Sequence, residues 1–142
     1  MATYGNKKIP FPSKGLYGYK GLVWAVCELT IGSAGAISAQ PLTVGAVVAV
    51  KTATETGRYT LTVPSGYRRF LGADVSLIGP TDAIWGANTV GGPSWFLRNN
   101  NIDRGTKAGT IDVQFAASTD NADAELPSGT IVNIVLWLGT GV

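Results

Sequence analysis

Three acidic residues in one short segment, Asp120, Asp123 and Glu125, form the group whose spacing first suggests chemistry. Calcium takes six to eight oxygen ligands, and this segment lacks both the EF-hand spacing and its central glycine. The chain has no histidine and one cysteine, Cys27, so catalysis of the Ser-His-Asp or Cys-His type is excluded. No serine–lysine or carboxylate-pair motif stands out. The sequence therefore predicts a protein that is not an enzyme, with no metal and no cofactor.

Two tryptophans in or beside loops suggest a binding site instead of a catalytic one. Trp85 lies in the least regular part of the sequence, and Trp95 precedes the turn Asn99–Asn101. Exposed indole rings stack on sugars, and the amide of Asn99 would add hydrogen bonds. Trp85, Trp95 and Asn99 are therefore the candidates for a ligand-binding loop.

The other two tryptophans, Trp24 and Trp137, fall in segments that are apolar on both faces of a predicted strand. A strand with two apolar faces must be covered on both. We therefore expect Trp24, Trp137 and the nearby Val135 to pack within the subunit or between subunits. Charged residues make up only 14% of the chain, about half the usual share, which is also typical of a subunit in an assembly.

The N-terminal segment, residues 1–21, differs in composition from the rest. It carries four lysines and no acid within its first twenty residues, whereas the remainder has a net charge of −2. Its glycines and prolines disfavour regular structure, and its aromatic rings favour an arm that docks on a partner, with a disordered tail as the alternative. The residues that we expect to bind this partner are Tyr4, Lys7, Lys8, Phe11 and Lys14. Four lysines without arginine, beside a near-neutral body, do not predict nucleic-acid binding.

From residue 22 onward, short runs with a period of two residues alternate with Gly, Pro, Asn and Asp, which predicts an all-β domain over residues 22–142. Residues 32–39 are expected to form a loop, and residues 67–70 a helical turn. Asp112 and Gln114 are expected to face solvent. No apolar run approaches the length of about 20 residues that crosses a membrane. We expect a jelly-roll-like β-sandwich or barrel of seven or eight strands, the predicted ones being Leu22–Thr30, Thr43–Thr54, Arg58–Val63, Leu71–Ile78, Ser94–Arg98, Thr110–Ala117 and Thr130–Thr140.

The stretch from residue 57 to the C-terminus resembles a group of capsid accessory proteins of tailed bacteriophages, the decoration or cement proteins. The segment Gly57–Val63 followed by Gly66–Ala73 is similar to their "G-x-Y-T-hydrophobic-T" and "Y-x-x-hydrophobic-L-G-A" pattern. The strand Asp112–Phe115 and the loop and apolar run over residues 124–138 are also similar. Residues 81–107 depart from the shorter connection expected in the group.

The resemblance implies a jelly-roll-like fold, usually trimeric, that sits on the capsid shell between capsomers and has no catalytic residues. We therefore expect a virion structural protein, made in the host cytoplasm, that decorates the capsid exterior. Its expected partners are the major capsid protein and further copies of itself, as a homotrimer, with no nucleic acid, membrane or small-molecule substrate. The alternatives are a phage head-fibre or tail-associated protein, a glycan-binding β-module, and a carboxylate hydrolase for which the sequence offers no arrangement.

Overall fold

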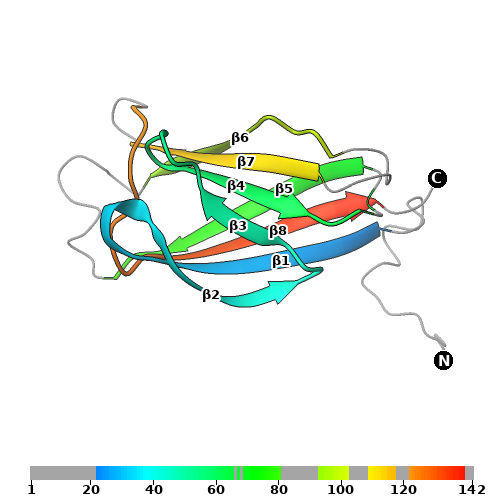
Figure 1. Ribbon diagram of the computed structural model, residues 1–142, viewed down its shortest axis with the longest axis horizontal. Helices are drawn as coiled ribbons and strands as arrows, with labels where there is room; N and C mark the ends of the chain where they lie inside the picture. Colours follow the sequence, from blue (N-terminus) through cyan, green and yellow to red (C-terminus); the bar gives the residue numbers. More distant parts are fainter. Residues whose placement is uncertain are drawn as a thin grey trace.

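Two antiparallel sheets pack face to face in the structure, a computed structural model that describes residues 22–65, 67, 69–80, 93–102, 109–117 and 122–139 (Figure 1). Sheet I has the strand order β2-β1-β8-β5, and sheet II has the order β3-β4-β7-β6. A short 3₁₀ turn, η2 (Ser33–Gly35), follows the first strand. The eight strands found in these residues are β1 (Leu22–Ile31), β2 (Ile37–Val44), β3 (Val48–Lys51), β4 (Arg58–Val63), β5 (Arg69–Ile78), β6 (Ser94–Arg98), β7 (Gly109–Ala116) and β8 (Ile131–Gly139).

This architecture confirms the predicted all-β sandwich. The finer expectation of a jelly-roll arrangement stays a prediction. Residues 1–21 lie outside the described residues, so the arm proposed there also stays a prediction. The same holds for the division of the chain at residue 21.

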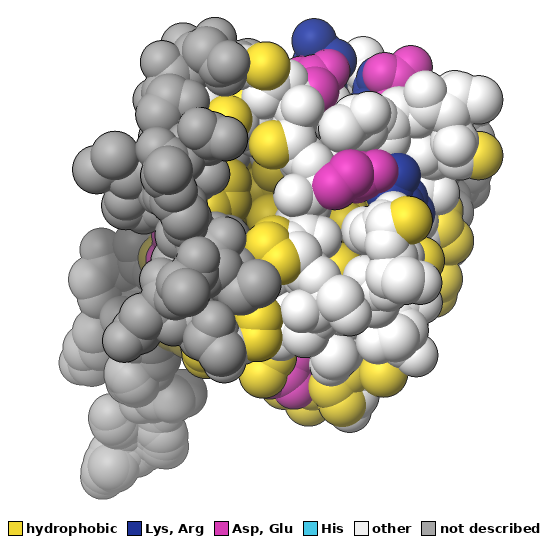
Figure 2. Space-filling view, turned by 90° about the vertical axis from the view of Figure 1, so that its left-hand side faces the viewer, with side chains coloured by type: hydrophobic (Ala, Val, Ile, Leu, Met, Phe, Trp, Pro, Cys, Tyr) yellow, Lys and Arg dark blue, Asp and Glu magenta, His cyan; other side chains and the backbone are white. Residues whose placement is uncertain are grey.

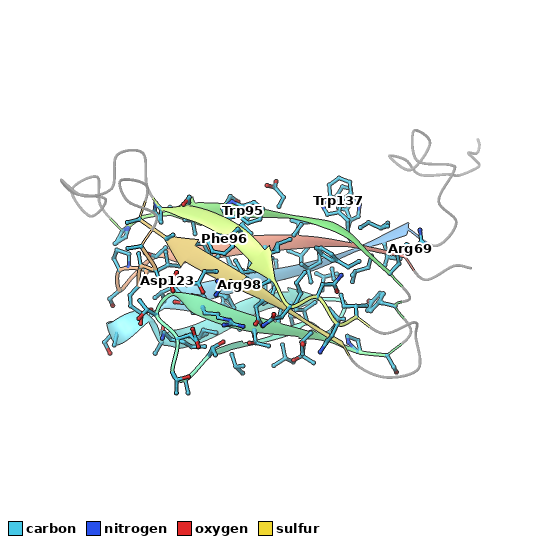
Figure 3. The ribbon with its side chains drawn as sticks, turned by 90° about the horizontal axis from the view of Figure 1, so that it is seen from above. Arg69, Trp95, Phe96, Arg98, Asp123 and Trp137 are labelled. Atoms are coloured by element: carbon cyan, nitrogen blue, oxygen red, sulfur yellow. The ribbon has the colours of Figure 1, made fainter. Side chains whose placement is uncertain are left out.

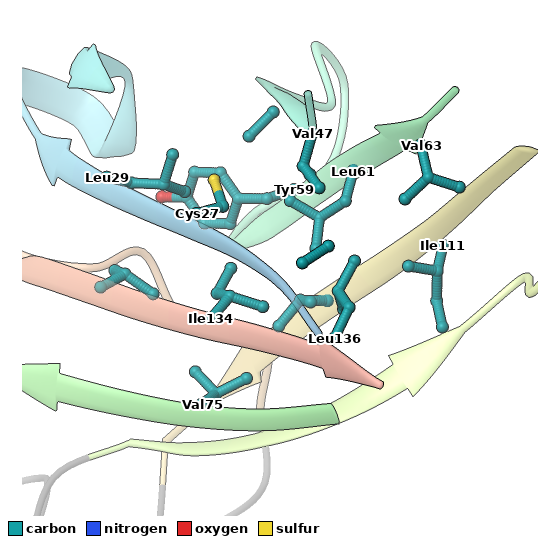
Figure 4. Close-up of a cluster of buried hydrophobic side chains, with 14 of the residues drawn as sticks. Cys27, Leu29, Val47, Tyr59, Leu61, Val63, Val75, Ile111, Ile134 and Leu136 are labelled. Carbon is teal, nitrogen blue, oxygen red and sulfur yellow. The ribbon is translucent and has the colours of Figure 1, made fainter. Parts of the chain in front are cut away.

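The hydrophobic core lies between the two sheets, where alternate residues of each strand point inward (Figure 4). The first and last described strands are neighbours at the centre of sheet I, in register from Leu22 opposite Gly139 to Thr30 opposite Ile131. One face of each strand lines the core, and the other, which carries Trp24 and Trp137, forms the outer surface. The largest fully buried side chains include Leu29, Ile31, Tyr59, Leu61, Ile111, Phe115, Leu126, Ile134, Leu136 and Leu138.

Three predicted elements are wrong in their boundaries. The single strand expected over Thr43–Thr54 is the end of β2 and all of β3, separated by a reversal at Gly45 and Ala46, which both have positive φ. The loop expected over residues 32–39 contains η2 and the start of β2. Arg69 and Phe70, expected in a helical turn, begin β5, because pairing with β8 starts at Arg69.

The segment 122–130 is tied to the sandwich through Glu125. One carboxylate oxygen of Glu125 accepts a hydrogen bond from the backbone N–H of Gly57 at 2.8 Å, and the other lies 3.0 Å from Lys51 Nζ. Gly57 has φ of +64°. A side chain there would overlap the carbonyl oxygen of Ala124, so the turn before β4 requires glycine. Nearby, the buried Tyr59 hydroxyl donates a hydrogen bond to the carbonyl of Gly35 at 2.7 Å.

Candidate interaction surfaces

The acidic segment that first suggested a cation site does not gather ligands in the described part of the chain. Glu125 is engaged with Lys51 and Gly57, as described above, and Asp123 is exposed and bridges Ala116 through its backbone. Asp120 lies outside the described residues. Among the residues that are described, no group of three His, Cys, Asp or Glu side chains is arranged to hold a metal ion.

Two tryptophans meet on the outer face of sheet I, which we define by the residues of β1, β2, β5 and β8 that point away from the core. Trp24 and Trp137 are directly opposite each other on β1 and β8, with ring centroids 5.6 Å apart and planes tilted by 36°. Trp24 is 49% exposed, and Trp137 is half-buried beside it. Figure 3 shows Trp137 projecting away from both sheets. Neither ring contributes to the core.

The tryptophan pair is continued by an apolar row one step along the strands. Val26 lies opposite Val135 on one side and opposite Val44 on the other, so three valines cross β8, β1 and β2 in order. Val44, on the edge strand, is 48% exposed. Exposed indole and valine side chains are stabilised when another apolar surface covers them and removes them from water. The predicted interface residues Trp24, Val135 and Trp137 are thus brought together on one face.

The next row of the same face is polar. Glu28 lies opposite Asn133, and Asn133 lies opposite Ser76 on β5. Asp74 lies opposite Val135 at the edge of the sheet and is exposed. The outer face of sheet I therefore presents carboxylate and amide groups beside its tryptophans and valines.

The outer face of sheet II has a different chemistry, centred on an ion pair. Asp112 accepts hydrogen bonds from Arg58 Nε at 3.0 Å, from Arg58 Nη2 at 2.6 Å and from Asn99 Nδ2 at 3.1 Å. Burial raises the pKa of Asp112, but the hydrogen bonds from Arg58, Thr60 and Asn99 outweigh it and hold the pKa below its ordinary value. The same ion pair raises the pKa of Arg58.

Asp112 and Gln114, two residues of β7 that were expected to face solvent, are buried in the structure. Asp112 is covered by its partners on neighbouring strands, and Gln114 is fully buried, with its amide donating to the carbonyl of Thr56 at 2.7 Å. The alternation of apolar and polar residues correctly places both on the outer face. It could not reveal that Arg58 and Asn99 cover Asp112, or that the loop before β4 contacts Gln114 through the carbonyl of Thr56.

The residues predicted to form a ligand loop are not gathered at one surface by the described structure. Trp95 lies opposite Phe115 and packs against the core, whereas the Asn99 side chain reaches Asp112 on the outer face of sheet II. Phe96 is 41% exposed there, with the Arg98 guanidinium 5.3 Å from its ring centroid (Figure 3). Trp85 lies outside the described residues, as do Tyr4, Lys7, Lys8, Phe11 and Lys14 of the expected arm.

Charge is sparse on the surface that Figure 2 presents, where hydrophobic and uncharged side chains predominate.

Cys27 is buried in the core, and burial raises the pKa of its thiol to about 11, which makes it a poor nucleophile. Within the described residues, no helix is long and apolar enough to span a bilayer.

Comparison with known proteins gives no relative for this chain, since no family model, curated protein or solved structure matches it.

Proposed function

We propose that this chain is a non-enzymatic virion structural protein that decorates and stabilises a bacteriophage capsid by bridging neighbouring major capsid proteins. The observation that carries the proposal is the outer face of sheet I, where Trp24 and Trp137 lie exposed together beside a row of valines. An exposed apolar patch on a sheet is typical of a surface that another protein covers. The capsid as the larger partner follows from the sequence resemblance over residues 57–142.

A β-sandwich with an apolar face and few charges is suited to a subunit that is present in many copies on a capsid shell. Each contact contributes modestly, but contacts made by one subunit to two capsid proteins add through effective concentration. The cationic, aromatic segment 1–21 is proposed as the arm that holds an acidic capsid exterior, with Tyr4, Lys7, Lys8, Phe11 and Lys14 as contact residues. The number of copies in the assembly, three by the resemblance, stays a prediction.

Deletion of residues 1–14 tests the arm. The truncated chain should fold with the same circular dichroism spectrum and melting temperature as the full chain but no longer co-sediment with capsid shells. Retained binding by the truncated chain would contradict the role of the arm. Loss of folding would show that the arm belongs to the sandwich, which the proposal also excludes.

A glycan-binding module is the second candidate, since an exposed indole pair on a sheet is also found in sugar sites. The row next to Trp24 and Trp137 argues against it, because that row consists of three valines and the polar pair Glu28–Asn133 lies one row further from the rings, where a sugar would need polar partners close by. Glycan-array binding that disappears in Trp24→Ala would favour this candidate. A location on a head fibre or tail, the remaining alternative, would be seen by electron microscopy of labelled virions.

A further inference from the structure

We propose that the free edge of β5 is a docking site for one extended segment of the capsid protein, which joins sheet I as a further strand. The inference rests on the proposed function and adds a mode of recognition to the partner named there. The edge borders the outer face of sheet I, since Gly72 and Asp74 of β5 lie opposite Trp137 and Val135. The same partner therefore covers the face and pairs with the edge.

The backbone groups that point to this edge follow from the pairing of β1 with β8. Along an antiparallel pair, residues that hydrogen-bond to one neighbour alternate with residues that bond to the other. The N–H of Ile31 donates to the carbonyl of Thr130 at 2.9 Å, and the register then holds without a shift along both strands. The even-numbered residues of β8, from Val132 to Leu138, therefore bond to β1, and the odd-numbered residues bond to β5.

The free edge of β5 consequently belongs to three residues. Asp74 and Ser76 lie opposite odd-numbered residues of β8, so their N–H and C=O groups bond to β8. The alternate residues Ala73, Val75 and Leu77 direct theirs away from the sheet. Within the described ranges, no backbone hydrogen bond reaches these groups. A row of unpaired N–H and C=O groups is a template for another extended chain.

The other edge strands of the described sandwich are protected in ways that β5 is not. At β3, the Gln40 side chain takes the place of a strand, because its Nε2 donates to the carbonyl of Val47 at 2.7 Å and its Oε1 accepts from the N–H of Ala49 at 3.3 Å. β2 contains Pro41, which has no N–H. β6 has five residues, whereas β5 has ten. Short strands, prolines and covered edges prevent pairing, so β5 is the edge that stays available.

The core is also less closed beside β5. The Gln40 contact holds β2 and β3 together at one side of the sandwich, so β5 and β6 border the other side. The inward-facing residues of these two strands include Ala73, Leu77, Trp95 and Leu97, which are only partly buried. An added strand with apolar residues facing inward would remove more of this surface from water.

The outward side of the added strand lies beside Asp74. Asp74 is exposed and forms no ion pair with a described residue. A lysine or arginine next to it on the partner strand would complement its charge. The expected capsid segment therefore alternates apolar residues with polar ones and carries a basic residue on its polar side.

Amide hydrogen exchange of the full chain, free and bound to shells assembled from a phage major capsid protein, tests the site residue by residue. In the free subunit, the amides of Ala73, Val75 and Leu77 should exchange fast, and those of Asp74 and Ser76 slowly. Shell binding should slow the first three at least about tenfold and leave the other two within about twofold. The amides of Asp74 and Ser76 are thus an internal control on the same strand.

Two pairs of variants test the site by shell binding. Ala73→Pro removes one edge N–H and leaves the bonds to β8, so it should weaken binding at least about tenfold, whereas Ala73→Ser keeps the N–H and should bind within about twofold of wild type. Asp74→Asn should weaken binding about threefold, whereas Asp123→Asn, at an exposed acid that bridges Ala116 of sheet II, should not. Circular dichroism establishes that each variant is folded, and the exchange of the wild type decides if Ala73→Pro is not.

Unchanged fast exchange at Ala73, Val75 and Leu77 on the shell, or equal binding by Ala73→Pro and Ala73→Ser, would overturn the site and leave the proposed function in place. Slow exchange of these three amides in the free subunit would also overturn it, because the edge would already be paired, by residues 81–92 or by another copy. A wild type that does not bind shells would refute the proposed function, and the site with it.

Discussion

Replacement of Gly57 by alanine should be among the most damaging single-methyl additions in this fold. Gly57 has φ of +64°, a conformation that costs a non-glycine residue about 1–2 kcal/mol. The new Cβ would overlap the carbonyl oxygen of Ala124 and lie 3.0 Å from the carbonyl oxygen of Phe115, both of which are backbone atoms. Relief of this overlap requires the segment 122–125 to move away from the turn.

That movement would break the 2.8 Å hydrogen bond from Gly57 N–H to Glu125 and disturb the 2.9 Å bond from Phe115 N–H to the Gly57 carbonyl. Each lost hydrogen bond costs about 1 kcal/mol net, so together with the cost of the positive φ the destabilisation is about 3–4 kcal/mol. For a chain of this size that corresponds to a fall in melting temperature of roughly 10–15 °C.

Gly139→Ala is the control, because a Cβ at Gly139 would meet its nearest neighbour, Arg69 Cβ, at an ordinary 3.7 Å. Thermal and urea unfolding, followed by circular dichroism, should show this variant within about 1 kcal/mol of the wild type. A Gly57→Ala protein that melts within about 3 °C of the wild type would refute the reasoning.

Three further predictions concern buried polar groups. Tyr59→Phe should lower the free energy of unfolding by about 1–2 kcal/mol, because the Gly35 carbonyl loses its donor; urea unfolding measures this, and an unchanged midpoint would contradict it. Since the folded pKa of Asp112 is depressed, its stabilising effect is present above the unfolded pKa of about 3.9 and is lost as pH falls through the folded value. Wild type should therefore exceed Asp112→Asn in stability at pH 7, by a margin that shrinks below about pH 4; a margin constant with pH would count against the ion pair. Cys27 should react with a thiol reagent at pH 8 only after unfolding. Rapid modification of the folded protein would contradict the burial of Cys27 in the core.

Strand positions were predictable from the sequence wherever one face alternates cleanly. Arg58–Val63 and Ser94–Arg98 were expected with their observed bounds, because turn residues flank each run. The error over Thr43–Thr54 has a physical cause. The apolar run continues through Gly45 and Ala46, so hydrophobicity alone gives no sign of the reversal that their positive φ values create.

The candidate surfaces were predictable only in part, since they depend on strand pairing. Periodicity left open whether Trp24 and Trp137 pack within the subunit or between subunits, since both faces of their strands are apolar, and only the register of β1 with β8 makes them a pair on the outer face. Likewise, Arg58 and Asp112 are 54 positions apart in the chain, and their contact follows from the pairing of β4 with β7. Single-sequence patterns carry no information on such non-local registers.

The central claim, that this chain decorates and reinforces a capsid, is tested most directly by the heat stability of shells with and without it. Capsid shells assembled from a phage major capsid protein, the proposed partner, would be loaded with the purified protein, washed, and heated while disassembly is followed by light scattering. The account predicts saturable binding at a fixed number of copies per shell and disassembly at a higher temperature. Shells that retain none of the protein, or that disassemble at the same temperature when saturated with it, would contradict the account.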